Sequence, residues 1–275
     1  MLNKLIKQGK PLIMGILNVT PDSFSDGGNH TVRGRAVTHA LQMIEEGADI
    51  IDVGGESTRP DAERVSPAEQ IRRVAGTIEA LRRTIPKNIL ISIDTTLSEV
   101  AAAAIDAGVN ILNDVRAGRD DEDMFKLAAE RDLPLILMHM QGTPATMQKD
   151  PTYEDVVADI EKFLEERCDA AIGAGVKKEN LIIDPGIGFG KTQEHNLMLL
   201  AHLDRFVKSG YPVLLGTSRK RFMGAICQGA ESQDLIGATC ATTSMGVTAG
   251  VQIFRVHDVK PNRQAADVSF AIHSA

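Results

Sequence analysis

Short apolar runs, each followed by a segment of helical periodicity, recur eight times along the chain and constrain its fold more than any other feature. They are rich in Ile, Leu and Val, as is typical of parallel strands whose two faces are both buried. The runs occupy residues 12–19, 50–54, 89–94, 110–113, 135–139, 181–184, 213–216 and 253–256. Amphipathic segments lie between them, including 35–46, 67–84, 153–174 and 195–208.

Residues typical of helix starts and helix ends lie at the boundaries of these segments. Ser66 and Pro67 suit an N-cap and a first helical turn. Glycines that suit C-terminal caps follow four periodic segments, at Gly47, Gly108, Gly175 and Gly210. Eight strand–helix units in 275 residues, with no linker between them, predict a single α/β domain over residues 1–275, a closed (β/α)8 TIM barrel. The structural alternative is an open, doubly wound sheet.

The composition is that of an ordinary globular protein and excludes several classes of function. The formal net charge is −7 and there is no long run of like charge, so we expect neither nucleic acid nor a membrane surface as a partner. No stretch reaches the roughly 20 apolar residues of a membrane span, and the N-terminal segment does not resemble a signal peptide. We therefore expect a cytoplasmic protein. Cys168, Cys227 and Cys240 lack metal-ligand spacing, and we interpret them as reduced thiols.

Polar residues stand at the end of almost every predicted strand. In a TIM barrel these positions form the active site at the C-terminal face. Burying polar groups without partners is costly, so a complete ring of them indicates a polar ligand held in the mouth of the barrel. The ring comprises Asn18, the segment 54–60, Asp94, Asn113, His139, Asp184, Ser218, Arg219, Lys220, Arg255 and His257.

The ring divides by charge. Asp94, Asn113 and Asp184 offer acceptors and one amide, which suits a heterocycle rich in donors. The basic residues gather on the seventh and eighth strands, where many barrels bind phosphate, as Arg219, Lys220, Arg255 and His257. The pattern indicates a heterocycle on one side and an anionic leaving group on the other.

Five segments resemble the signature sequences of dihydropteroate synthases, in that family's order. They are Asn-Val-Thr-Pro-Asp-Ser-Phe-Ser-Asp-Gly-Gly at 18–28, Gly-Gly-Glu-Ser-Thr-Arg-Pro at 54–60, Asp-Pro-Gly-Ile-Gly-Phe-Gly-Lys-Thr at 184–192, Ser-Arg-Lys at 218–220 and Arg-Val-His at 255–257. The chain departs from the family at Asp61, where Gly is usual, and at Arg221, where a small residue is common. Both departures concern detail of the loops rather than the reaction.

The resemblance implies that p-aminobenzoate is joined to 6-hydroxymethyl-7,8-dihydropterin pyrophosphate, giving 7,8-dihydropteroate and pyrophosphate. It implies a pterin site formed by Asp94, Asn113, Met138, Asp184 and Lys220. A carboxylate such as Asp184 can accept from an adjacent ring N–H and amine together. Catalytic roles fall on Asp26, Asp94, Lys220, Arg255 and His257.

The resemblance also implies the other two subsites. The pyrophosphate is expected on Asn18, Thr58, Arg59, Arg255 and His257, with Mg²⁺ beside it and Asn18 as the protein ligand of the metal. Few protein ligands are needed, since Mg²⁺ keeps waters and binds phosphate oxygens. The p-aminobenzoate site is expected from Phe24, Thr58, Pro60, Phe189, Ser218 and Lys220. Asp22, Asp26 and Arg59 are expected to order the two long loops, and the family predicts a homodimer.

Several other interpretations fit parts of the sequence. Residues 186–192 look like a P-loop, but only three residues separate Gly186 from Gly190 where four are needed. The segment around Ser218 lacks the second glycine of a nucleophile elbow, so we interpret Ser218 as a binding residue. His139 suits either a pocket role or a structural hydrogen bond. The alternatives for the whole chain are a pterin-binding methyltransferase that transfers a methyl group from a folate to a corrinoid, and a non-catalytic pterin-binding relative.

Overall fold

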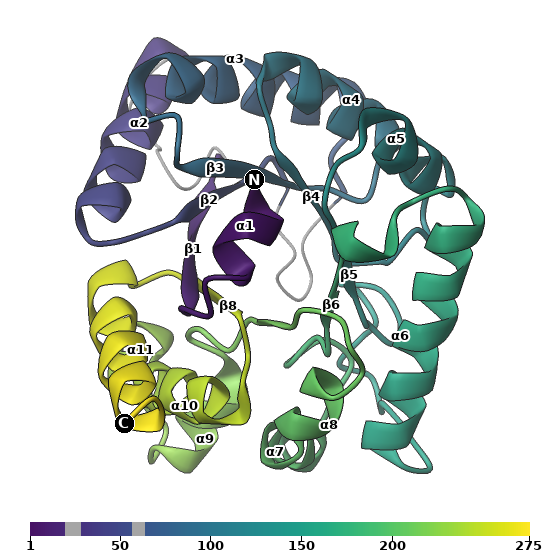
Figure 1. The fold of residues 1–275 in the computed structure, drawn as a ribbon, viewed down its shortest axis with the longest axis vertical. Helices are drawn as coiled ribbons and strands as arrows, with labels where there is room; N and C mark the ends of the chain where they lie inside the picture. Colours follow the sequence, from purple (N-terminus) through teal and green to yellow (C-terminus); the bar gives the residue numbers. More distant parts are fainter. Residues whose placement is uncertain (20–28, 57–63) are drawn as a thin grey trace.

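Eight parallel strands form one sheet in the computed structural model, which describes residues 1–19, 29–56 and 64–275 (Figure 1). The strands are β1 (Leu12–Asn18), β2 (Ile50–Gly54), β3 (Leu90–Asp94), β4 (Ile111–Asp114), β5 (Leu135–Met138), β6 (Leu181–Asp184), β7 (Leu214–Leu215) and β8 (Ile253–Val256). Each lies within a residue or two of a predicted strand. The expected loop residues Asp22, Phe24, Asp26, Thr58, Arg59, Pro60 and Asp61 lie outside the described part of the chain.

The sheet closes on itself. Its strand order is β6-β5-β4-β3-β2-β1-β8-β7, and a parallel bridge between Ile183 and Val213 joins the two outer strands. The Ile183 N–H also donates to the Pro212 carbonyl at 2.9 Å. This seam makes the sheet a barrel, so the (β/α)8 prediction is confirmed and the open-sheet alternative is excluded.

All the helices except the first, α1, surround the barrel, and Figure 1 shows them as an outer ring. In the described residues the helices are α1 (Leu2–Ile6), α2 (Asn29–Glu45), α3 (Pro67–Thr84), α4 (Ser98–Ala107), α5 (Asp123–Arg131), α6 (Val156–Gly173), α7 (Gln193–Ala201), α8 (Leu203–Val207), α9 (Arg221–Ile226), α10 (Ile236–Ala249) and α11 (Val259–His273). Short 3₁₀ turns occur at Lys178–Asn180 and Ser232–Asp234. In this part of the chain, no helix is both long enough and apolar enough to cross a membrane.

The predicted helix ends are largely confirmed. The Ser66 side chain accepts from the Glu69 N–H and Pro67 begins α3, while Gly47, Gly108, Gly175 and Gly210 all have positive φ, which suits glycine at these ends. The single helix predicted over 195–208 was wrong, because His202, with φ −119° and ψ 29°, separates α7 from α8.

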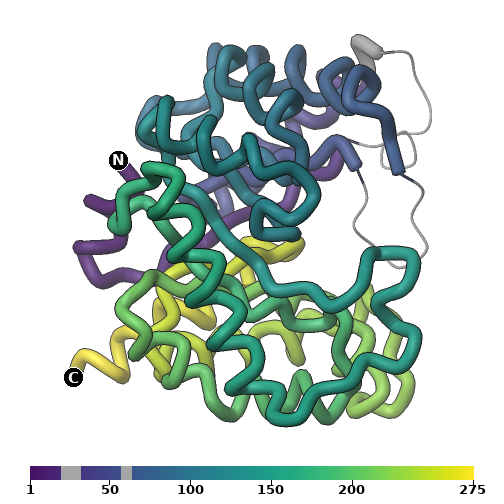
Figure 2. The backbone as a smooth tube through the Cα atoms, turned by 90° about the vertical axis from the view of Figure 1, so that its right-hand side faces the viewer, coloured from purple at the N-terminus to yellow at the C-terminus, as the bar shows by residue number. Residues whose placement is uncertain are grey.

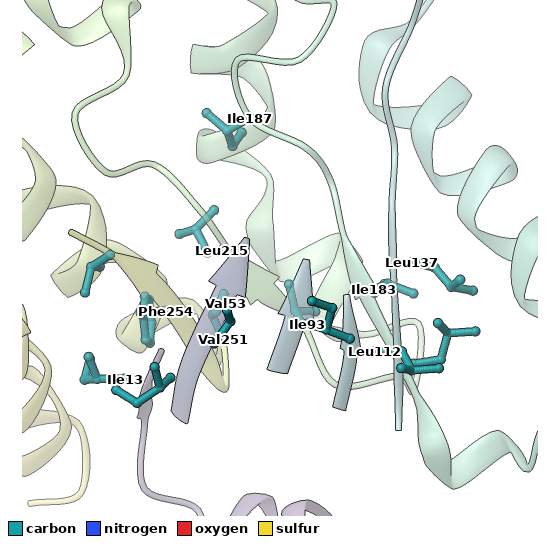
Figure 3. Close-up of a cluster of buried hydrophobic side chains, with 14 of the residues drawn as sticks. Ile13, Val53, Ile93, Leu112, Leu137, Ile183, Ile187, Leu215, Val251 and Phe254 are labelled. Carbon is teal, nitrogen blue, oxygen red and sulfur yellow. The ribbon is translucent and has the colours of Figure 1, made fainter. Parts of the chain in front are cut away.

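Alternate residues along each strand face opposite sides of the barrel wall. The outward-facing set packs against the helices and includes Val53, Ile93, Leu112, Leu137 and Ile183, drawn in Figure 3. This packing is the main hydrophobic core of the molecule.

The inward-facing residues nearest the start of each strand form a second apolar cluster, called the floor of the barrel here. It contains Leu12, Met14, Ile50, Leu90, Ile111, Ile136, Ile182, Leu214 and Ile253, together with Leu2 from α1. Leu5 and Ile6 of α1 pack against the same cluster, so this short helix covers one end of the barrel (Figures 1 and 2). The sequence periodicity did not predict α1.

Candidate active site

On several strands, the inward-facing residue two positions after a floor residue is polar, so a polar layer lies above the apolar floor of the barrel. Ile50 is followed by Asp52, Leu90 by Ser92 and Asp94, and Ile111 by Asn113. The same two-residue step leads from Ile182 to Asp184 and from Ile253 to Arg255. Because these pairs share a side of their strands, the polar members all point into the mouth.

A cavity of about 730 Å³ opens at this end of the barrel. Nine residues predicted for the site line it: Asn18, Asn113, Met138, Asp184, Phe189, Ser218, Lys220, Arg255 and His257. Asp94 joins the same group through an ion pair with Arg255. The structure therefore brings together every residue of its described part that was predicted for the pterin, pyrophosphate or p-aminobenzoate subsite.

Arg255 binds two carboxylates in the barrel interior. Its Nε donates to Asp52 Oδ2 at 2.7 Å, and its Nη2 donates to Asp94 Oδ2 at 2.7 Å. The side chain of Asp52 is fully buried, and its Oδ2 also accepts from Asn113 Nδ2 at 3.2 Å. Two carboxylates thus fix the guanidinium in place and compensate much of its charge, which the sequence had not predicted.

Asp52 was missing from the predicted site. It stands in the middle of the apolar run Ile-Ile-Asp-Val-Gly, where a charge is costly unless it is paired. The signal that could have found it is its position two residues after the inward-facing Ile50. The prediction considered only the residues at strand ends and therefore did not include Asp52.

The carboxylates of the mouth are strongly desolvated. Burial raises the pKa of Asp184 to about 6, although the Gly186 N–H donates to its Oδ1 at 2.7 Å and Lys220 lies near. Burial also raises the pKa of Asp94, and Arg255 opposes that rise. Oδ1 of Asp52 and Oδ1 of Asp94 have no hydrogen-bond partner among the described residues. Unpaired buried acceptors are rare and indicate a place where a ligand or solvent donor belongs.

Lys220 lies half-buried between the acidic layer and an aromatic ring. Its Nζ is 3.9 Å from the centre of the Phe189 ring, the geometry of a cation–π contact. Burial, with Arg255 nearby, lowers the pKa of Lys220 to about 8. Its ammonium group therefore loses its proton at a lower pH than an exposed lysine does.

The basic side chains that follow β7 and β8 differ in their hydrogen-bond partners. Arg219 has a positive φ of 58° and forms a two-pronged ion pair with Asp258, at 2.9 and 2.6 Å. His257 contacts Ser218: its backbone N–H donates to Ser218 Oγ at 3.1 Å, and its Nδ1 lies 3.0 Å from the same oxygen. Burial and the neighbouring Arg255 lower the pKa of His257 to about 3, so this imidazole is neutral in the free site.

Loop contacts support two subsidiary interpretations. Glu56 accepts from the Val65 N–H at 2.9 Å and from Gln70 Nε2 at 3.2 Å, so it stabilises the start of α3. Lys191, the lysine of the P-loop-like segment, is 3% exposed and donates to the Gly186 and Phe189 carbonyls. Its side-chain nitrogen is directed at the backbone, which argues against the P-loop interpretation.

Metal binding requires oxygen or nitrogen donors that converge. In the described residues no group of three or more His, Cys, Asp and Glu side chains could hold a metal ion. Cys168 is buried, Cys240 is partly buried and Cys227 is exposed, and all three are free thiols.

Comparisons with known proteins agree with this geometry. The family model described as "Pterin binding enzyme" matches residues 14–257. The dihydropteroate synthase of Streptococcus pyogenes serotype M6 is 49% identical over 268 residues, covering 97% of each chain. The crystal structure of the Yersinia pestis dihydropteroate synthase with a sulfonamide drug complex is 41% identical with a TM-score of 0.90, covering 97% of this chain and 95% of that one.

A further solved structure carries one of the expected substrates. The dihydropteroate synthase of Xanthomonas albilineans with 4-aminobenzoic acid is 43% identical to this chain, with a TM-score of 0.90, and the match covers 97% of this chain and 94% of that one. Sequence, fold and the residues of the barrel mouth therefore agree, and the chain belongs to the dihydropteroate synthase family of pterin-binding enzymes.

Proposed function

We propose that this barrel forms 7,8-dihydropteroate from 6-hydroxymethyl-7,8-dihydropterin pyrophosphate and p-aminobenzoate. The amine nitrogen bonds to the exocyclic carbon of the pterin, the C–O bond to pyrophosphate breaks, and the amine loses one proton. The observation that carries the proposal is a single cavity of about 730 Å³ that joins a layer of acceptors to a group of basic residues. Members of the family are transferases, as this reaction requires.

The acceptor layer suits the pterin. Gly186 holds Oδ1 of Asp184, and among the described residues Oδ2 has no hydrogen bond, so it can accept from the pterin. The Asn113 amide donates to Asp52, which turns its carbonyl oxygen into the available group. Lys220 supplies a donor for the ring carbonyl, and Met138 lines the same wall. Together these groups match a ring edge with two donors beside one acceptor.

The pyrophosphate belongs on the side of β8. Arg255 lies in β8, His257 directly follows that strand, and both line the cavity with Asn18. Pre-placed donors stabilise negative charge as the leaving group develops it. An anion beside the neutral His257 ring would raise the pKa of His257, so protonation and anion binding favour each other there.

Asn18 is the proposed protein ligand of Mg²⁺. Its amide oxygen is a hard donor at the cavity wall beside the proposed pyrophosphate site, which fits a metal that binds phosphate oxygens and few protein groups. Bound there, Mg²⁺ would neutralise charge on the leaving pyrophosphate. Arg255 and His257 would keep the anion in place.

The p-aminobenzoate subsite lies between β6 and β7. Phe189 gives an aromatic wall, and Ser218 gives a hydroxyl for the carboxylate, beside Lys220. The neutral arylamine is already a nucleophile, so no catalytic triad is required. The expected contributions of Phe24, Thr58 and Pro60, like those of Asp26 and Arg59, fall outside the described residues and stay predictions.

The direct test is an assay for release of pyrophosphate. Release should require the dihydropterin pyrophosphate, p-aminobenzoate and Mg²⁺ together, with one product formed per pyrophosphate. Each omission serves as a control. Release that ignores p-aminobenzoate would indicate a hydrolase, and absence of release with the pterin still bound would indicate the non-catalytic relative. Methyl transfer from a folate to a corrinoid would favour the alternative enzyme class.

A homodimer is also proposed, through the faces of α10 and α11. These helices pack on each other and leave Met245 51%, Val268 61% and Ile272 72% exposed. A second copy would cover such side chains, in keeping with the homodimer expected of the family. Sedimentation equilibrium should give twice the monomer mass, and Val268→Asp should lower it. The cytoplasmic location stays a prediction.

A further inference from the structure

A buried lysine outside the proposed substrate contacts lies beside the p-aminobenzoate wall. Lys191 is 3% exposed, and its Nζ lies 2.8 Å from the Gly186 carbonyl oxygen, 2.9 Å from that of Phe189 and 2.9 Å from His139 Nδ1. Three polar atoms thus surround one side-chain nitrogen, and burial lowers the pKa of Lys191 well below its usual value. Fully buried lysines are rare unless paired, so this arrangement calls for a function.

The turn that Lys191 binds has an unusual backbone. Gly186, Gly188 and Gly190 have φ values of 67°, 83° and 63°. A Cβ on Gly186 would lie 1.9 Å from the His139 carbonyl oxygen, and one on Gly190 would lie 2.4 Å from that of Gln141. The turn is therefore pressed against the chain that follows β5. Buried carbonyls in such a turn need donors, and Lys191 supplies them.

His139 completes the connection to β5. Its backbone N–H donates to the Asp184 carbonyl at 3.0 Å, and its ring meets Phe163 edge-on at 4.8 Å between centres. Burial, with Lys191 beside it, lowers the pKa of His139 to about 2, so the ring is neutral and Nδ1 can accept from Lys191. His139 therefore takes the structural role that the sequence left open.

Other bonds hold the same turn from its rim. Tyr153 Oη donates to the Gly190 carbonyl at 2.6 Å, and the Gly188 N–H donates to Asn196 Oδ1 at 2.7 Å. The turn carries Phe189, whose ring lies over Lys220. A shift in the turn would move the aromatic wall and the lysine contact together.

We propose that Lys191, bound to His139, is a positioning residue that fixes the 186–190 turn and so sets the place of Phe189 at the p-aminobenzoate subsite. It acts through the backbone carbonyls and does not take part in bond making or breaking. The inference rests on the proposed assignment of Phe189 to p-aminobenzoate. Its consequence is a selective loss of affinity for that substrate when the bonds from Lys191 are removed.

The test compares Lys191→Met with Phe189→Ala and with the exposed control Lys126→Met on α5. Methionine keeps much of the length of lysine but cannot donate a hydrogen bond. In the full-length protein, Lys191→Met should raise the KM for p-aminobenzoate on the order of tenfold. The kcat and the KM for the pterin pyrophosphate should change less than about threefold, and the control should match the wild type.

Tyr153→Phe provides a milder second variant, which tests the premise of the proposal if Lys191→Met fails to fold. It removes only the bond to the Gly190 carbonyl and should raise the KM for p-aminobenzoate about two- to fourfold, with kcat unchanged. A raised KM would show that hydrogen bonds to the turn set the place of Phe189, and an unchanged KM would overturn that premise and the proposal with it.

The outcomes separate the inference from the proposed site. If Phe189→Ala raises the KM for p-aminobenzoate while Lys191→Met and Tyr153→Phe do not, the positioning role is overturned and the subsite stands. If Phe189→Ala leaves that KM unchanged, the assignment of Phe189 is wrong. If Lys191→Met lowers kcat and raises both KM values alike, its effect is general damage to the barrel mouth and the inference is overturned.

Discussion

The floor and the mouth of this barrel are built from the same strands and differ by a step of two residues. The floor is a packed apolar cluster that α1 covers, and the mouth holds desolvated charges. Packing in the floor lowers the free energy of the folded state, while burying carboxylates in the mouth raises it. The floor therefore supplies stability, and the mouth supplies the charged groups for binding and reaction.

Removing the central cation should have the largest effect. Arg255→Met leaves Asp52 and Asp94 buried without a counter-charge, so we expect a loss of about 3–5 kcal/mol in the free energy of unfolding near neutral pH. Denaturant unfolding at two pH values checks this. The loss should shrink at acid pH, because burial raises the pKa of Asp94 and protonation then removes the unpaired charge. A pH-independent loss would contradict the charge explanation.

A cavity in the floor should lower the free energy of unfolding by almost as much and leave pterin affinity unchanged. Ile136→Ala removes a fully buried side chain and should destabilise the fold by about 2–5 kcal/mol. Pterin affinity at a temperature where the variant is folded should equal that of the wild type. Calorimetric titration checks the second point. A large loss of affinity would show that the floor and the mouth are coupled more strongly than their separate packing implies.

Asp184→Asn should weaken pterin binding and stabilise the fold at alkaline pH. The pterin affinity should fall by about 1.5–3 kcal/mol, because a neutral amide replaces a charged acceptor. The folded-state pKa of Asp184 is raised, so its favourable contribution exists below about pH 4 and is lost as the pH rises through about 6. Asparagine carries no charge to bury, so the variant should have a higher Tm than the wild type at about pH 8 and a similar Tm at about pH 4. A lower Tm at high pH would mean that burial of the carboxylate is not costly.

The smallest effect is expected in the pH profile of the unmodified enzyme. The kcat/KM for the pterin substrate should fall below about pH 6, where Asp184 becomes protonated, and above about pH 8, where Lys220 loses its proton. Lys220→Arg should remove the alkaline limb, since guanidinium stays charged, whatever its effect on the maximum. A flat profile between about pH 5 and 9 would contradict both assignments.

The signature loops and the strand ends could be located from the sequence because their residues stand in short contiguous motifs. Asp184, Ser218 and Arg255 stand in short motifs next to apolar runs, and the barrel rule places such positions at one face. The same reasoning missed Asp52 and Lys191. The roles of both residues depend on partners that lie far away in the sequence. Asp52, for example, pairs with Arg255, which is 203 positions away.

The sequence by itself determined the alternation of strands and helices, the closed barrel and the family, because hydrophobic periodicity and contiguous motifs are properties of neighbouring residues. Only the tertiary structure decided the charge state of the mouth. It paired Arg255 with two carboxylates, turned Arg219 to Asp258 and left His257 neutral. The physical reason is that a pKa depends on burial and on every charge within a few ångströms, and both are set by the fold.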